Sequence, residues 1–340
     1  MKNILFLLGA GFNKDARSEA GKIIGRHLYK GEYVINVDYP LVKDIRKICF
    51  GEEKLDSGQS VEEKISKAIL GGDYKPIKRL YEEIMRADFY LVPKLLSSSN
   101  KPLSCYAKFF AKFQSSSFLT FNYDSLVEVF LLRSNRWHPS DGYGVPVITE
   151  IEWGERQESV KARSKSFVLH LHGSLCIYSV EFDLTNKEGS NMKWIVQKHS
   201  PDFVFDPDSI SDLFIPYERV PPVIGGYTYI ENRVIAPVPD KAEGLKGRFF
   251  KEVHSKAKLL LENAEILVSI VFSFNLLDKS SYEHLIQYFS EFGNRKVIII
   301  APDASDLVKR LEKLYQPIEW MPIGKTFKHW VDSKFLGIDI

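Results

Sequence analysis

The chain has 340 residues, of which 44% are hydrophobic and 26% are charged, and its formal net charge is +2. This is the composition of an ordinary soluble globular protein, long enough for one large domain or two modest ones. The near-neutral charge excludes a strong electrostatic attraction to nucleic acid, so nucleic-acid binding is not indicated.

The three cysteines, Cys49, Cys105 and Cys176, lie far apart and form no Cys-x-x-Cys pair. Neither a four-ligand structural zinc site nor a disulfide framework is therefore expected. The first apolar run is too short for a signal peptide, and no run approaches the roughly 20 apolar residues that a membrane span needs. We therefore expect a cytoplasmic protein that does not enter a membrane.

The first segment predicts a buried strand from Lys2 to Leu8 that ends in Gly9-Ala10-Gly11. A strand that leads through a Gly-x-Gly turn into a helix is typical of nucleotide-binding α/β folds, because glycines let the backbone approach a diphosphate. Apolar spacing predicts that helix over Asn13–Tyr29. Lys14 stands where the dinucleotide fingerprint has its third glycine, and there is no P-loop. A plain strand–helix turn is the alternative interpretation.

Residues 30–112 have helical apolar spacing without a convincing strand, which predicts a helical insertion or subdomain. A second strand over Ser115–Phe121 ends at Asn122-Tyr123-Asp124 and leads into a helix over Ser125–Arg133. We therefore expect the chain to return to the first sheet after the insertion.

A third strand over Ser166–His170 ends at Leu171-His172-Gly173-Ser174. Residues 178–232 are polar and contain several prolines, so they predict an irregular excursion of loops and short strands. The remaining chain alternates helix and strand, with predicted helices at 247–262, 280–292 and 306–314, and strands at 265–272, 296–301 and 318–321.

Short apolar strands that alternate with helices predict an α/β fold of Rossmann-like, doubly wound type. Its sheet is mainly parallel, with the helical insertion after the first strand, and residues 1–340 form a single domain. In such folds ligands bind outside the carboxyl ends of the strands. We expect the clusters that follow four strands to meet there, namely Gly9-Ala10-Gly11, Asn122-Tyr123-Asp124, His172-Gly173-Ser174 and Ser273-Phe274-Asn275.

The polar residues of these clusters each have a functional and a structural interpretation. Asn122 and Asp124 are able to orient a hydroxyl, a carboxamide or a water, but both also suit a turn. The neutral imidazole of His172 is able to act as a general base near pH 7, whereas a lone histidine at a strand end is more often structural. Ser273 is able to bind phosphate or ribose, or to cap the next helix. Asp15 either contacts a ligand or favours the helix dipole.

Taken in order, these motifs resemble the SIR2-like domain of the sirtuin superfamily. Gly9-Ala10-Gly11 matches the opening motif, Thr120-Phe121-Asn122-Tyr123-Asp124 matches Thr-x-Asn-x-Asp, and His172-Gly173 matches a His-Gly at a strand end. The layout from Ile235 to Ser273 also follows the family. The chain lacks the two Cys-x-x-Cys pairs of classical sirtuins and has a long helical stretch, so it is more similar to the prokaryotic antiphage-defence branch than to protein deacylases.

That resemblance implies an NAD hydrolase that releases nicotinamide, forms ADP-ribose and depletes NAD in antiviral defence, without zinc. It implies that Asn122 holds the nicotinamide ribose and a water, that Asp124 contacts the carboxamide, and that His172 is the base. Asn122 and His172 would thus be catalytic. The residues expected to contact NAD are Gly9, Ala10, Gly11, Asn13, Asp15, Thr120, Asp124, Gly173, Ser273 and Asn275.

Three positions depart from the family pattern: Asn13 replaces a usual Ser, Phe272 a Gly, and Ala301 an Asn near the adenosine ribose. They leave open a non-catalytic sensor or assembly subunit that binds NAD or ADP-ribose. A protein deacylase, with its acyl-lysine tunnel under residues 178–232, is a third alternative. The resemblance also implies activation by a ring-forming ATPase, by another defence subunit or by assembly into a homo-oligomer.

Overall fold

The computed structural model of the chain describes residues 3–21, 27–29, 32–34, 37–51, 55, 59–96, 104–138, 141–145, 148–149, 164–182, 193–196, 227–238, 241, 245, 248–275, 279–293 and 295–338. Within this part of the chain, no helix has the length and apolar character of a membrane-spanning segment.

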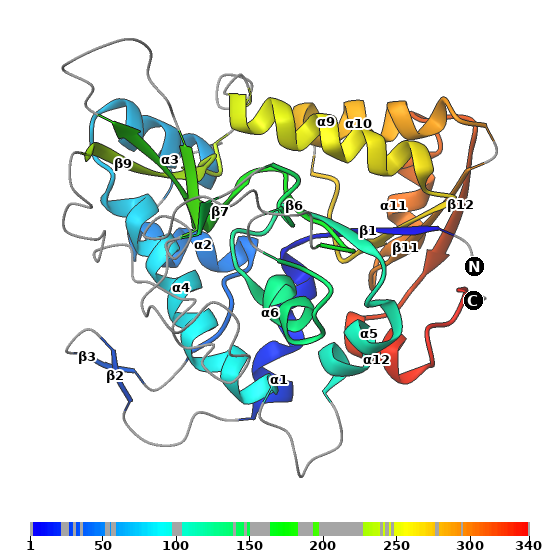
Figure 1. Ribbon diagram of the computed structural model, residues 1–340, viewed down its shortest axis with the longest axis horizontal. Coiled ribbons are helices and arrows are strands. Elements are labelled where there is room, and N and C mark those ends of the chain that lie inside the picture. Colours follow the sequence, from blue (N-terminus) through cyan, green and yellow to red (C-terminus); the bar gives the residue numbers. More distant parts are fainter. Residues whose placement is uncertain are drawn as a thin grey trace.

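A six-stranded sheet forms the centre of the molecule (Figure 1), and every neighbouring pair in it is parallel. The central strands are buried along their whole length because both faces are covered by helices, which explains their uninterrupted apolar sequences. The predicted α/β, Rossmann-like class with a parallel sheet is confirmed. In spatial order the strands are β12 (Ile318–Ile323), β11 (Arg295–Ile300), β10 (Ile266–Ile270), β1 (Ile4–Leu8), β4 (Ser117–Thr120) and β6 (Val168–His170).

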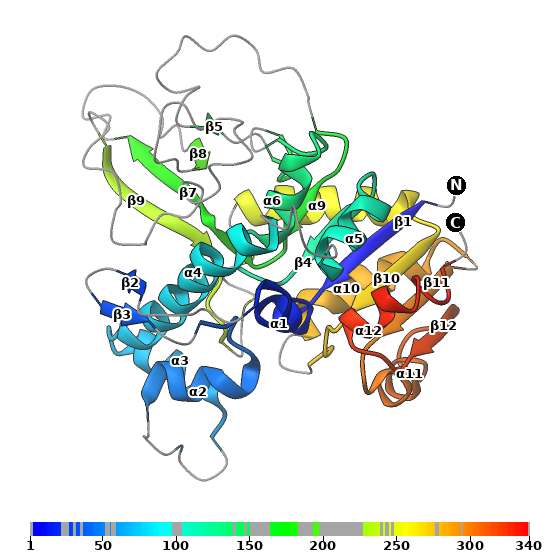
Figure 2. The same ribbon diagram turned by 90° about the horizontal axis from the view of Figure 1, so that it is seen from below.

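Helices cover both faces of this sheet. Figures 1 and 2 show α9 (Arg248–Asn263) and α10 (Lys279–Ser290) on one face, and α5 (Cys105–Phe113) and α12 (Phe327–Asp332) on the other. Two further helices follow strands directly, α6 (Leu126–Arg133) after β4 and α11 (Ala304–Leu311) after β11. The helix α12 is an element that the sequence analysis did not predict.

The predicted helix over Asn13–Tyr29 is wrong in its second half. A short 3-10 helix, η1 (Ala10–Asp15), continues into α1 (Ala16–Ala20), which ends at Gly21. The φ of Gly21 is +82°, a left-handed conformation that terminates helices. Beyond it, β2 (His27–Tyr29) and β3 (Glu32–Val34) form an antiparallel hairpin.

Three helices of the predicted insertion lie beyond the carboxyl ends of the central strands (Figures 1 and 2): α2 (Val42–Phe50), α3 (Val61–Leu70) and α4 (Lys75–Leu96). Their apolar faces form a second, smaller core that includes Ile65, Leu80 and Ile84. The insertion therefore forms a wall next to the edge of the sheet where ligands bind in this class of fold.

A second sheet accounts for the described part of the stretch expected to be irregular. Its order is β5 (Ile148–Thr149), β8 (Lys193–Val196), β7 (Gly173–Phe182) and β9 (Tyr227–Val234). The described residues within 178–232 are β8 and parts of β7 and β9, and β7 pairs with both of these strands. Residues 183–192 and 197–226 lie outside the described residues.

Candidate functional site

The carboxyl ends of β10, β1, β4 and β6 lie side by side, and hydrogen bonds continue between the residues that follow them. The N–H of Gly9 donates to the carbonyl of Ile270 at 3.1 Å, and that of Leu171 donates to Thr120 at 2.9 Å. From β1 the chain builds β4 and β6 on one side, and later β10, β11 and β12 on the other. The strand order therefore reverses between β1 and β10, which is where open α/β sheets bind their ligands.

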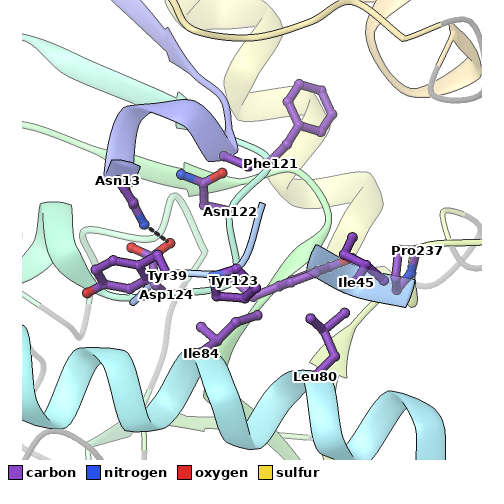
Figure 3. Close-up of a pocket in the computed structure, with 12 residues that line it drawn as sticks. Asn13, Tyr39, Ile45, Leu80, Ile84, Phe121, Asn122, Tyr123, Asp124 and Pro237 are labelled. Carbon is purple, nitrogen blue, oxygen red and sulfur yellow. Dashed lines mark hydrogen bonds between the residues drawn. The ribbon is translucent and has the colours of Figure 1, made fainter. Parts of the chain in front are cut away.

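A pocket of about 90 Å³ lies at this edge, between the sheet and the helical insertion (Figure 3). One part of its wall is polar and comes from the turns after β1 and β4. The other part is apolar and includes Leu80 and Ile84 of α4. Polar groups beside an apolar wall suit a small ligand whose apolar part packs on the wall and whose polar part bonds the turns. The lining residues are Ala10, Asn13, Tyr39, Pro40, Ile45, Leu80, Ile84, Phe121, Asn122, Tyr123, Asp124 and Pro237.

Asn13 and Asp124 meet inside this pocket (Figure 3). Nδ2 of Asn13 donates to Oδ2 of Asp124 at 2.6 Å, and the other carboxylate oxygen accepts the N–H of Leu126 at 3.1 Å. Because an ionised carboxylate only accepts, the Asn13 atom that faces it must be the amide nitrogen. The amide oxygen of Asn13 is then buried without a hydrogen-bond partner among the described residues. It is a buried acceptor that the N–H of a ligand would satisfy.

The environment of Asp124 shifts its titration toward neutral pH. Burial raises the pKa of this carboxyl to about 6, and the nearby charge of Glu128 acts in the same direction. The bonds from Leu126 and Asn13 and the charge of His170 oppose the shift. A carboxyl that titrates near neutrality and lines a pocket is typical of a functional site.

Asn122 links the turns after β1 and β4. Its Nδ2 donates to the carbonyl oxygen of Gly9 at 3.2 Å, and its backbone N–H donates to Oγ1 of Thr120 at 3.0 Å. Thr120 is buried and does not line the pocket, so it acts on the turn and not on a ligand. Of the four clusters expected to meet, two contribute to the pocket, through Ala10 and through Asn122 and Asp124, and Asn13 joins them from the following helix.

His172 does not join these residues in the pocket. Its side chain is only 4% exposed, and its Nε2 has no hydrogen-bond partner in the described part of the chain. Burial lowers its pKa well below the usual value, and the positive charge of Lys241 adds to that effect, so the imidazole is neutral. The Phe121 ring meets the imidazole edge-on at 4.7 Å and points away from Asn13 and Asp124 in Figure 3.

The Phe121 ring that contacts His172 also stacks on the ring of Phe272, and we call these two rings the aromatic pair. Phe121 follows β4 and Phe272 follows β10, and their rings stack at 4.7 Å with planes 10° apart. Because β1 lies between β4 and β10, the aromatic pair spans the carboxyl end of β1. In this arrangement the pair covers the crevice in which a dinucleotide would cross the sheet.

The two glycines of the first turn allow β10 to approach closely. A Cβ on Gly9 would lie 2.6 Å from Cα of Phe272, and a Cβ on Gly11 would lie 2.2 Å from Cγ1 of Val271. In this conformation the space beside both glycines is filled by the end of β10. Exposed Ala10 is the turn residue that lines the pocket.

The chain after β10 has unusual backbone geometry. Val271 and Phe274 have φ values of +45° and +47°, and a left-handed conformation is a clear outlier for a β-branched residue. The family pattern has a glycine at the position of Phe272, but in this structure the residue whose backbone conformation favours glycine is Val271. Arg310 holds this turn by donating to the carbonyls of Ser273 at 2.9 Å and Phe274 at 3.0 Å. The side chain of Ser273 is exposed and that of Asn275 is half-buried, and neither lines the pocket.

Two further predicted contact residues lie away from the pocket. Asp15 accepts the backbone N–H of Lys328 at 3.0 Å, at the start of α12. The contact is with a helix other than the one that Asp15 precedes, and Asp15 makes no side-chain capping bond to α1. Gly173, with φ of +84°, begins β7 and pairs with Val234 of β9.

Buried ionisable residues behind the pocket were missed by the sequence analysis. Glu128 bonds His170, and Asp88 accepts from the hydroxyl of Tyr39 and, at 3.2 Å, from Ser125. Burial raises the pKa of Asp88 well above its usual value, and the charge of Asp124 raises it further. The sequence alone could have indicated Glu128, because it is the one acidic residue within the otherwise apolar helical run 126–132, and a buried acid needs a partner. No three His, Cys, Asp or Glu side chains of the described residues are placed to share a metal ion.

Comparisons with known proteins found no matching family model and no matching curated protein. Two Sir2 homologue variants, one in complex with ADP-ribose and one with 2'-O-acetyl ADP-ribose, each align over 100% of this chain and 95% of theirs, at 13% identity and a TM-score of 0.44. A structure described under sirtuin substrate affinity aligns over 97% and 92%, at 12% identity and a TM-score of 0.42. Sequence identities and TM-scores this low carry no argument about function. The fold class is assigned from the order and direction of the strands.

Proposed function

We propose that the pocket binds the nicotinamide end of NAD and that the chain is a SIR2-like NAD hydrolase. The observation that carries this proposal is the unpartnered amide oxygen of Asn13, held beside Asp124 in a pocket with an apolar wall. Nicotinamide is a planar ring with one carboxamide. Its N–H matches the Asn13 oxygen, and its ring matches the wall that includes Leu80 and Ile84. The ordered SIR2-like motifs support the same assignment.

The chemistry asks little of the protein beyond orientation, exclusion of water and a base. Water attacks the ribose carbon while the bond to the pyridine nitrogen breaks, the electron pair stays on nicotinamide, and the proton of the water passes to a base. We assign to Asn122 the orientation of the ribose and the water; its bond to the Gly9 carbonyl and its place in the pocket lining support this role. His172 is the proposed base. In the closed site burial lowers its pKa, so it accepts that proton readily only when its surroundings become more polar.

The burial of His172 sets a condition on this mechanism. The aromatic pair lies over the end of β1, and Phe121 contacts the imidazole directly. Hydrolysis with His172 as the base therefore requires Phe121 and Phe272 to separate. A rearrangement of this kind agrees with an enzyme that works only after activation. From the resemblance we propose activation by a ring-forming ATPase, another defence subunit or homo-oligomer assembly, and NAD depletion in antiviral defence as the result.

The same burial favours a second candidate, a sensor or assembly subunit that binds NAD or ADP-ribose without turnover. Such a protein would need the pocket but not an accessible base, and the structure has the pocket but a covered imidazole. The two candidates differ in one observable, the release of free nicotinamide.

The test incubates purified protein with NAD, alone and with the products of neighbouring genes, and measures nicotinamide and ADP-ribose by liquid chromatography. Hydrolase activity predicts equal amounts of both products, abolished in His172→Ala and strongly reduced but still measurable in Asn122→Ala. Calorimetric titration with NAD runs in parallel. Binding without product under every condition supports the sensor, and the absence of both overturns the proposed site.

A further inference from the structure

Glu128 and His170, which we call the buried pair, form a contact that the proposed reaction does not use. Nε2 of His170 lies 2.6 Å from Oε1 of Glu128, and the two side chains are 1% and 2% exposed. Glu128 belongs to α6 and His170 ends β6, so the pair joins a helix to the sheet directly behind the pocket.

The second ring nitrogen of His170 reaches the residue proposed to orient the substrate. Its Nδ1 lies 2.8 Å from the backbone carbonyl oxygen of Asn122. A carbonyl oxygen only accepts, so Nδ1 carries a hydrogen and donates it. The other nitrogen, Nε2, faces the carboxyl group of Glu128, and a second hydrogen there would make the ring an imidazolium.

The surroundings favour that charge state. Burial lowers the pKa of His170, but the charge of Glu128 and the bonds to Glu128 and Asn122 raise it, and the net shift is upward. Asp124, after β4, adds a further negative charge that raises this pKa, and Asp88 of α4 lies close to both Asp124 and Glu128. The Tyr143 ring packs 5.9 Å from the imidazole.

Asn122 is thereby held at three points. Its carbonyl accepts from His170, its N–H donates to Thr120, and its side-chain nitrogen donates to Gly9. Among the described residues no hydrogen bond engages its side-chain oxygen, which is left for a ligand in the pocket that Asn122 lines. Fixing both the main chain and the amide nitrogen of one residue sets the direction of that oxygen.

We propose that Glu128 and His170 are positioning residues that orient the Asn122 amide toward the substrate, an inference that rests on the proposed function. The pair touches no substrate and acts through the Asn122 main chain. Misplacement by about 1 Å at a reacting centre costs up to about 100-fold in rate. We therefore expect His170→Gln to lower kcat about 10- to 100-fold while KM for NAD changes less than about threefold.

A kinetic cycle with Asn122→Ala separates positioning from a general effect on folding. If the pair acts through Asn122, His170→Gln lowers kcat in the wild-type background but has no further effect once Asn122 is Ala. Glu128→Gln is the second variant, because it keeps the shape of the pair and removes its charge. Arg133→Gln is the matched control, since it removes a side-chain bond of 2.6 Å to the Leu96 carbonyl from the same helix. Equal losses of kcat in both backgrounds would overturn the proposal.

A second readout does not depend on NAD. Nuclear magnetic resonance of the Asn122 side-chain NH2 reports its order, and 15N shifts of His170 report how many ring nitrogens carry hydrogen. We expect a doubly protonated ring in the wild type and a loss of Asn122 order in His170→Gln but not in Arg133→Gln. Unchanged Asn122 order would overturn the positioning role even if the protein hydrolyses NAD. If the Asn122 side chain loses order in His170→Gln but the wild-type protein neither binds nor hydrolyses NAD, the proposed function is wrong and the positioning of Asn122 by His170 still holds.

Discussion

Replacing Phe272 by Ala should uncover His172 and loosen the closed crevice. The Phe272 side chain is 5% exposed and contacts Phe121, Phe274 and Tyr282, with ring centroids 4.7, 4.7 and 5.7 Å away. Truncation of such a ring costs about 3–5 kcal/mol. That is less than the total stability of many domains, about 5–15 kcal/mol. The variant should therefore fold with a lower Tm.

The size of the opening follows from the stacked contact. An aromatic pair contributes about 0.5–1.5 kcal/mol beyond its buried area, so its loss should raise the open population about 2- to 12-fold. The neutral imidazole of His172 then becomes accessible to diethylpyrocarbonate, whose product is quantified at that residue by mass spectrometry. We expect the rate of modification and the affinity for ADP-ribose to rise by this factor.

The matched control is Phe249→Ala, which removes a ring of similar burial, 3% exposed, from α9. It should lower Tm but leave the reactivity of His172 unchanged. If Phe272→Ala and Phe249→Ala show the same His172 reactivity, the aromatic pair does not control access to the imidazole. The requirement for a rearrangement before hydrolysis would then be wrong.

Three further results are expected. Asn13→Ala should weaken NAD binding about 5- to 30-fold, the equivalent of about 1–2 kcal/mol. Calorimetry should show nearly unchanged ADP-ribose binding, because ADP-ribose has no carboxamide. Equal losses of affinity for both ligands would show that nicotinamide binds at another site. Gly11→Ala should lower the free energy of unfolding by about 1–3 kcal/mol, because the new Cβ would lie 2.2 Å from Val271. In urea unfolding, adding Val271→Gly should restore most of that loss. If the two substitutions act additively, Gly11 and Val271 do not pack against each other. Asp124, with its pKa raised from 3.8 to about 6, binds its proton more tightly when folded. The protonated Asp124 therefore contributes fully to the free energy of unfolding below about pH 4, and this contribution is lost as pH rises through about 6. The free energy of unfolding should decrease by an amount on the order of 3 kcal/mol over this range. Urea titrations at several pH values should show this slope in the wild type and a smaller one in Asp124→Ala.

The sequence was a good guide to the sheet and a poor one to the connections. Strands such as Ile4–Leu8 and Ile266–Ile270 are apolar throughout because both faces are covered, and this pattern needs no knowledge of their neighbours. The helix predicted to run to Tyr29 stops at Gly21, since a left-handed glycine outweighs the apolar spacing beyond it.

Part of the candidate site was also predictable from the parallel sheet. Parallel strands bring their ends together, so the turns after β1 and β4 were expected to meet, and Ala10, Asn122 and Asp124 do line one pocket. The contacts of His170 with Glu128 and the burial of His172 depend on how α6 and the aromatic pair pack, which no local pattern encodes.

The most direct test of the central claim is a crystal structure of the Asn122→Ala variant grown with NAD. The pyridine ring should lie against Leu80 and Ile84, with the carboxamide nitrogen within hydrogen-bonding distance of Oδ1 of Asn13. A dinucleotide bound with its pyridine outside this pocket would show that the pocket is not the nicotinamide site.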